Sequence, residues 1–174
     1  AVGRTFEESL GKALRSLETG RAGFGADGKG EETALTDEEL FAALSRPTAE
    51  RIFLAAEALR RGFSPQKINH ITKMDIWFLD GFKRIIDMEE ELKACKGVPD
   101  ADLLKRAKEM CFADSYIGTL CHMKQAEVKA LREKYGIIPS FKMVDTCAAE
   151  FASYVPYFYS TYEEENESVV SNKK

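Results

Sequence analysis

Residues 72–95, TKMDIWFLDGFKRIIDMEEELKAC, contain the longest helical pattern in the chain. Apolar side chains recur there at the three- and four-residue spacing of one helix face; they are Ile76, Trp77, Leu79, Phe82, Ile85, Ile86 and Leu92. Thr72 can cap this helix, and the Gly-Val-Pro sequence at 97–99 ends it. We therefore expect a helix over about residues 73–95, whose anchors in the core are Trp77, Phe78 and Leu79.

Signals for helix starts and stops lie on both sides of this pattern. Thr5–Glu8 and Thr36–Glu39 both fit the capping box, in which a threonine and a glutamate satisfy the first free N–H groups of a helix. Further starts are expected near Thr48, Ser64 and Asp100, and two more helices over about 114–121 and 124–135. The pattern predicts an all-α fold, an irregular orthogonal bundle of about eight helices with its main body in residues 34–136.

The pattern changes after Gly136. Residues 137–144 contain Pro139 and are expected to be extended rather than helical. An aromatic stretch follows, with rings at Phe151, Tyr154, Tyr157, Phe158, Tyr159 and Tyr162. We see no convincing strand pair here and expect a segment that wraps the bundle. It is either an ordinary cover of the core or a seam against another domain or subunit, since tyrosine suits half-buried interfaces.

Composition narrows the function classes. The chain has 174 residues, 44% of them hydrophobic, which fits one globular domain. No apolar run is long enough for a membrane span, and a net charge of −4 argues against nucleic acid as a partner. Four cysteines at positions 95, 111, 121 and 147 form no CxxC pair. We expect reduced thiols in a cytoplasmic protein.

Candidate chemical sites are weak. The glycines of residues 19–33 indicate a flexible linker, because the lysine and serine or threonine of a phosphate loop are missing. Cys111, Cys121 and His122 lack the close pairing of a zinc site. We expect no catalytic, cofactor-binding or metal site in this segment. An alternative is a helix-turn-helix DNA-binding module over residues 112–135, although Glu127 and Glu133 interrupt its basic second helix.

Several longer motifs resemble one family. Val144-Asp145-Thr146-Cys147-Ala148-Ala149-Glu150-Phe151 and Tyr157-Phe158-Tyr159-Ser160-Thr161-Tyr162-Glu163 resemble the end of the central helical domain of carbamoyl-phosphate synthetase large subunits. Asp75–Leu79 resembles the D-x-W-F-L helix of that domain. The opening, Val2–Glu18, is similar to the family's exit from its first ATP-grasp module. The resemblance spans nearly the whole chain and points to the bacterial type of enzyme.

The resemblance implies a division of the chain. Residues 1–18 would be the exit helix, 19–33 the Gly-rich linker, 34–168 the helical oligomerisation domain, and 169–174 the start of the linker to the second synthetase half. It implies an interdomain seam made of Asp145, Thr146, Cys147, Glu150, Phe151, Tyr157, Tyr159, Thr161, Tyr162 and Glu163.

The resemblance also implies a function. The segment alone would be no enzyme and would hold no cofactor; it would link two ATP-grasp halves and support subunit association. The parent enzyme would make carbamoyl phosphate from glutamine-derived ammonia, bicarbonate and two ATP, with Mg or Mn and K. The expected partners are the flanking ATP-grasp halves, other large subunits and a glutamine amidotransferase small subunit.

Overall fold

The computed structural model describes residues 1–148, 150–151 and 157–168. These residues form eight α-helices, one short 3₁₀ helix and one pair of strands. The elements are α1 (Phe6–Ser16), η1 (Glu31–Ala34), α2 (Asp37–Leu44), α3 (Arg51–Arg60), α4 (Pro65–Thr72), α5 (Ile76–Ala94), α6 (Ala101–Glu109), α7 (Asp114–Cys121), α8 (Gln125–Lys134), β1 (Ser140–Met143) and β2 (Phe158–Thr161). The predicted all-α fold with a C-terminal extension is confirmed.

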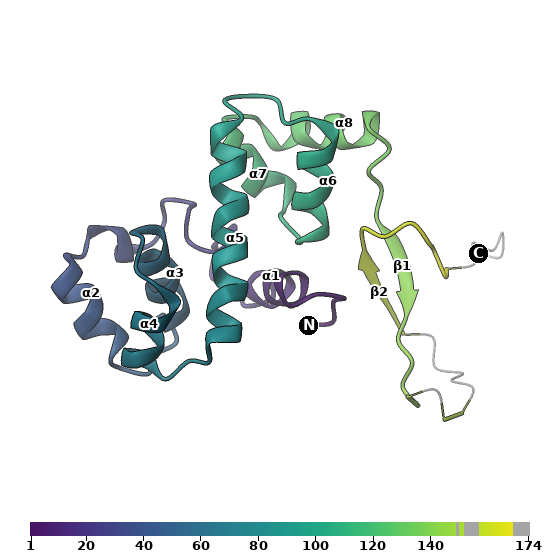
Figure 1. Ribbon diagram of the computed structural model, residues 1–174. Coiled ribbons are helices and arrows are strands. Elements are labelled where there is room, and N and C mark those ends of the chain that lie inside the picture. The colour runs from purple at the N-terminus through teal and green to yellow at the C-terminus, as the bar shows by residue number, and fades with distance from the viewer. Residues whose placement is uncertain (149, 152–156, 169–174) are drawn as a thin grey trace.

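Helix α5 lies at the centre of the fold. Helices α2, α3 and α4 group on one side of it, and α6, α7 and α8 on the other (Figure 1). The helix starts three residues later than expected, because Asp75 rather than Thr72 caps it: the Asp75 carboxylate accepts a hydrogen bond from the N–H of Trp77 at 2.8 Å. Thr72 instead ends α4, where Lys73 turns the chain with a positive φ of 60°.

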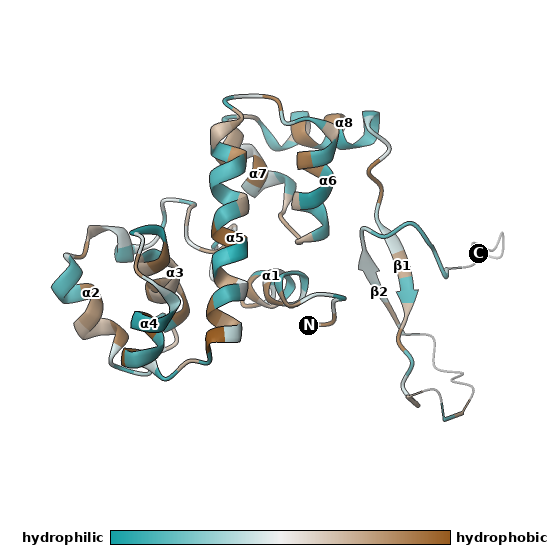
Figure 2. Cartoon of the chain, viewed as in Figure 1, coloured by the Kyte–Doolittle hydropathy of each residue, from teal (hydrophilic) through white to brown (hydrophobic). Residues whose placement is uncertain are grey.

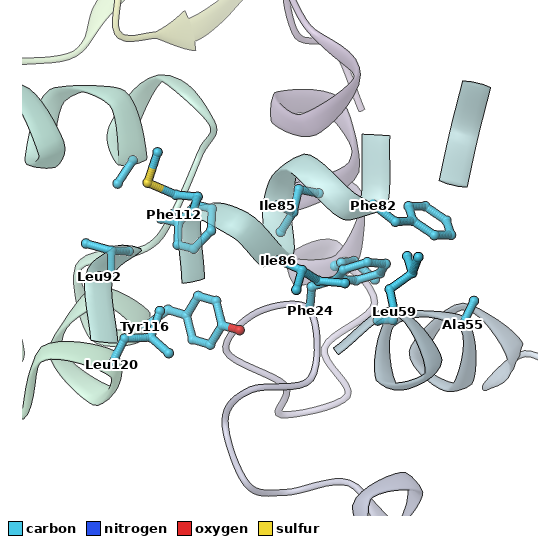
Figure 3. Packing of buried hydrophobic residues seen from close by; sticks show 14 of the residues in the cluster. Phe24, Ala55, Leu59, Phe82, Ile85, Ile86, Leu92, Phe112, Tyr116 and Leu120 are labelled. Atoms are coloured by element: carbon cyan, nitrogen blue, oxygen red, sulfur yellow. The ribbon is translucent and has the colours of Figure 1, made fainter. Parts of the chain in front are cut away.

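One continuous hydrophobic core runs along α5. Phe82, Ile85 and Ile86 meet Phe24 and Leu59 on one side, and Leu92 meets the side chains of α7 on the other (Figure 3). Removal of this apolar surface from water is the main stabilising contribution to such a fold. Because α5 contributes buried residues along its length, both groups of helices depend on it.

A buried carboxylate, Glu89, lies within this core. The side chain is fully buried, and it accepts hydrogen bonds from Arg60 at 2.8 and 3.0 Å and from the hydroxyl of Tyr116. Burial raises the pKa of Glu89, and Arg60 and Tyr116 oppose that shift. The contacts join α3, α5 and α7 at one point.

Residues 19–33, expected to be a flexible linker, pack on the bundle. Phe24 is 2% exposed and meets Phe82 with ring centroids 4.8 Å apart. A Cβ atom at Gly23 would lie 2.1 Å from the Tyr116 ring, so close packing explains this glycine. The backbone oxygen of Phe24 also accepts a hydrogen bond from Arg60. The backbone N–H of Ala26 donates to the Tyr116 hydroxyl, and Arg21 pairs with Asp27 and Glu32. Composition does not reveal these contacts, because most of their partners lie outside the glycine-rich stretch.

Two of the three expected core anchors lie at the surface. Trp77 is 58% exposed and Phe78 is 46% exposed, whereas Leu79 is fully buried. Consecutive helical residues point about 100° apart, so the core takes Leu79 and leaves its two predecessors outside. The hydrophobic residues at the first turn of α5 are visible in Figure 2.

The C-terminal extension differs from expectation in forming a strand pair. β1 and β2 are antiparallel, and Ser140 lies opposite Thr161 while Met143 lies opposite Phe158. The two strands are far apart in sequence, so no short hairpin turn between them could predict that they pair. Residues 149 and 152–156 lie outside the described residues, and they include part of the expected aromatic stretch. The expected linker 169–174 also lies outside the described residues.

The burial difference within α5 gives a stability test. Leu79→Ala should destabilise the fold by about 2–5 kcal/mol, since it opens a cavity in the core. Trp77→Ala should cost only about 1 kcal/mol, the scale of its edge contacts with Phe6 and Phe78. Urea unfolding of both variants measures this. An equal or larger loss for Trp77→Ala would contradict the exposed position of the indole.

Candidate interaction surface

The strand pair, which we call the hairpin (residues 140–143 and 158–161), is held to α1 by one lysine, and an ion pair joins the residues that flank the two elements. The Lys12 ammonium donates to the backbone oxygen of Ser160 at 2.5 Å and lies 5.3 Å from the centre of the Tyr159 ring. Arg4 pairs with Glu163 at 3.0 Å. These contacts place one face of the hairpin against the first helix of the chain.

A cluster of charged side chains lies beside Tyr162, the residue that follows β2. Lys108 and Arg132 bind the two oxygens of Asp114 at 2.7 and 3.0 Å, which joins α6, α7 and α8. Lys108 also lies 5.1 Å from the centre of the Tyr162 ring. Burial opposes ionisation of Asp114, but hydrogen bonds from Lys108 and Arg132 outweigh it and lower the pKa of the carboxyl. Burial lowers the pKa of Lys108.

The polar face of the hairpin is buried, and its apolar face is exposed. The face toward the bundle carries Ser140, Lys142 and Thr161, all of them buried. The outer face carries Phe141, Met143 and Phe158, which are 42%, 45% and 44% exposed. A soluble protein usually turns the apolar face of a two-stranded sheet inward. The outward apolar face therefore marks a surface suited to contact with another protein surface.

A second apolar surface lies where α1 meets α5. Trp77 and Phe78 pack edge-on against Phe6, with ring centroids 5.3 and 5.6 Å from that of Phe6. Ile76 beside them is 37% exposed. Gly81 makes room for this cluster, because a Cβ atom there would lie 2.4 Å from the Phe6 ring. Aromatic side chains of this kind are enriched at the energetic centres of protein interfaces.

The expected seam residues divide between the two sides of the hairpin. Thr161 is buried and Tyr162 is packed against the core, so neither is available to a partner. Tyr157, Phe151 and Glu150 are exposed. The carboxylate of Asp145 accepts a hydrogen bond from the N–H of Cys147 at 2.9 Å, a local turn. The N–H of Val144 donates to the oxygen of Tyr157 at 2.7 Å, which brings the two motifs together.

The predicted seam leaves out Phe141 and Met143 of the outer face of the hairpin. Ser140, Phe141, Lys142 and Met143 alternate small or polar with large apolar, which is the two-residue period of a strand. That signal was available, but over four residues it is short, and the pairing partner lies beyond residue 157. The direction of the apolar face depends on how the hairpin docks, which the period does not reveal.

The helix-turn-helix alternative gains no support from α7 and α8. Arg132 is held by Asp114, and Lys129 lies 3.9 Å from Glu133. The N–H of Lys124 donates to Glu127. The basic side chains of α8 therefore share their face with acidic ones, whereas a recognition helix offers cations to phosphates and base edges.

In the part of the chain that the structure describes, none of the helices is both long and apolar enough to cross a lipid bilayer. Within the same residues, no three His, Cys, Asp or Glu side chains gather where they could bind a metal ion.

A helical bundle with two outward apolar surfaces is the structure of an association module. The chain belongs to the family described as "Carbamoyl-phosphate synthetase large chain, oligomerisation domain", which matches residues 1–136. A curated relative, the carbamoyl phosphate synthase large chain of Archaeoglobus fulgidus, is 45% identical over 180 residues. That match covers all of this chain and 16% of the relative, so the chain spans about a sixth of its length.

The charged cluster at Asp114 yields a pH prediction. Asp114→Asn should cost about 2–3 kcal/mol at pH 7, because it weakens the pairing of the buried Lys108. The lowered pKa means that the ionised carboxyl stabilises the fold; this contribution is complete above the unfolded value of about 3.9 and is lost as pH falls through the folded value. The difference between variant and native chain should therefore shrink at pH 2–3 in urea unfolding.

The matched control is Asp102→Asn. Asp102 pairs with Arg106 on the surface, with its side chain 80% exposed, and such pairs contribute little. A loss below about 0.5 kcal/mol is expected at either pH. An Asp114→Asn loss that stayed constant down to pH 2 would count against the linkage argument.

Proposed function

We propose that this chain is a connector in a carbamoyl-phosphate synthetase large chain: it joins two ATP-grasp halves and supports association of large chains. The observation that carries the proposal is the apolar face of the hairpin, which is exposed instead of buried. Burying Phe141, Met143 and Phe158 under a neighbouring module would remove apolar area from water, at about 25 cal/mol per Å². A hairpin of two strands is marginal by itself, so a covering surface also stabilises its pairing.

The proposed neighbour on the hairpin is the synthetase half that follows in the large chain. Tyr157 and Phe151 are also exposed, at 63% and 75%, in the segment between β1 and β2. The N–H groups of Phe141 and Met143 are already bound, to Asn166 at 3.1 Å and to Glu167 at 2.6 Å. The chain itself therefore covers the free edge of β1, so a neighbouring module cannot add a strand there. We propose that the module instead contacts the side chains of the outer apolar face of the hairpin.

The remaining assignments concern the whole protein. We propose a cytoplasmic, bacterial-type enzyme that makes carbamoyl phosphate from glutamine-derived ammonia, bicarbonate and two ATP. The ATP, Mg or Mn and K belong to the ATP-grasp halves, and an amidotransferase small subunit supplies ammonia. The name of the Archaeoglobus fulgidus relative supports the reaction class. The segment described here contributes no catalytic group to that proposal.

Self-association is tested by light scattering behind size exclusion, over a concentration series. A mass near 39 kDa, about twice the 19.5 kDa of one chain, that falls on dilution is the expected result. A mass of 19.5 kDa at every concentration would contradict self-association of this segment and leave the bridging role as its function.

The bridging role is tested by one double variant in two settings. Phe141→Ser with Phe158→Ser should lower the unfolding free energy of the isolated chain by about 1–2 kcal/mol, because the two rings are 42% and 44% exposed and the change removes the part of each that is already buried. In a large chain that contains this segment, the same change should cost about 2–4 kcal/mol more than in the isolated chain and lower carbamoyl phosphate synthesis. Differential scanning calorimetry and a synthesis assay measure the two effects.

The control is Val98→Ser. Val98 is 64% exposed in the connection between α5 and α6, apart from the hairpin. This substitution should change neither the unfolding free energy of the isolated chain nor the stability and activity of the large chain. Equal effects of the double variant in the isolated and the complete chain would mean that the hairpin face is not covered by a neighbouring module.

A further inference from the structure

Two of the four cysteines lie side by side. Cys95 is the residue that ends α5, and Cys121 is the last residue of α7. Their sulfur atoms are 3.6 Å apart, and both approach the backbone oxygen of Leu92, at 3.0 and 3.5 Å. A disulfide bond is about 2.05 Å long, so the sulfurs need to close by roughly 1.5 Å. Cys95 stands at a helix end, where a small rotation meets little resistance.

The surroundings of the two thiols differ. Cys121 is 1% exposed, and burial, together with the hydrogen bond from Cys95, raises its pKa to about 12. Cys95 is half-buried and lies next to the surface loop at residues 96–99. A small oxidant can therefore reach the Cys95 sulfur first. The sulfur of Cys121 is then the neighbour placed to complete the reaction.

The other two cysteines have different partners. The Cys111 sulfur accepts a hydrogen bond from Arg15 at 2.9 Å. Cys147 lies in the turn after β1, with its sulfur 3.9 Å from the Thr146 hydroxyl. Both serve as internal controls for a reaction specific to the first pair.

From this geometry we infer that Cys95 and Cys121 are a redox pair that closes to a disulfide when the chain meets a small disulfide such as oxidised glutathione. The Cys95 thiolate attacks one sulfur of the oxidant; a mixed disulfide forms and one small thiolate leaves. The Cys121 sulfur then attacks the Cys95 sulfur and displaces the second small thiolate. The two protons of the protein thiols pass to the two released thiolates. The protein loses two electrons and the oxidant gains them.

The bond would join the end of α5 to the end of α7 across 26 positions of sequence. A cross-link of that span restricts the unfolded chain and so favours the folded one. For a chain of this size, the expected rise in the thermal midpoint on oxidation is about 5–10 °C. The hairpin and the first turn of α5 are not part of the linked segment, so both apolar surfaces stay as they are.

The test is oxidation of the purified chain by oxidised glutathione, followed by acid quench, alkylation of the remaining thiols and peptide mass mapping. The expected product is a chain that has lost two hydrogen atoms, with one linked peptide pair that contains Cys95 and Cys121. Calorimetry of the oxidised and reduced forms should show the midpoint shift. Cys111→Ser and Cys147→Ser should leave both results unchanged, while Cys95→Ser should abolish both.

Three outcomes would overturn the inference. The first is a chain that is folded by circular dichroism and carries four free thiols after oxidation. The second is a linked peptide pair that contains Cys111 or Cys147 in place of Cys95 or Cys121. The third is an oxidised native chain whose midpoint equals that of its reduced form. If Cys121→Ser fails to fold, the mapping of the native chain still decides, since it needs no variant.

Discussion

A fully buried carboxylate constrains the whole bundle. Glu89 sits in the core of α5 and is held by Arg60 of α3 and Tyr116 of α7. Removing one partner would leave an unpaired polar or charged group away from water, which costs far more than a lost surface contact. The hydrophobic stripe of α5 would tolerate small rotations of its neighbours, whereas these directed bonds do not. The helices on both sides of α5, and through them the base of the hairpin, take their positions from this point.

The sequence predicted local features well because their physics is local. The capping box at Thr36 forms with both of its bonds, and α7 spans the expected residues 114–121. The start of α5 was missed because Thr72 and Asp75 both have the chemistry of a cap, and only the turn at Lys73 decides between them. Trp77 was placed inside because a periodic pattern gives the apolar face but not the angle at which the core ends.

The sequence indicated which C-terminal motifs belong to the candidate surface, but not which way their side chains face. The motifs around Asp145 and Tyr157 do come together, yet Thr161 and Tyr162 turn toward the bundle and Phe141 and Met143 turn away. That choice depends on Lys12, Arg4 and Lys108, which come from distant parts of the chain. A short strand carries the alternation of its own side chains, but the face that meets the bundle is selected by partners that no local pattern contains.

The exposed apolar face of the hairpin has a consequence for how substitutions in this segment would be tolerated. In a survey that scores variants by folding of the isolated segment, Phe141, Met143 and Phe158 would rank with half-buried positions, because water already reaches 42–45% of each residue. If a neighbouring module covers this face as proposed, a survey scored by growth on the complete enzyme would rank the same positions with core residues. Under that proposal, selection at these sites acts through the assembled protein. Measurements of the segment by itself would then understate how strongly these positions are constrained.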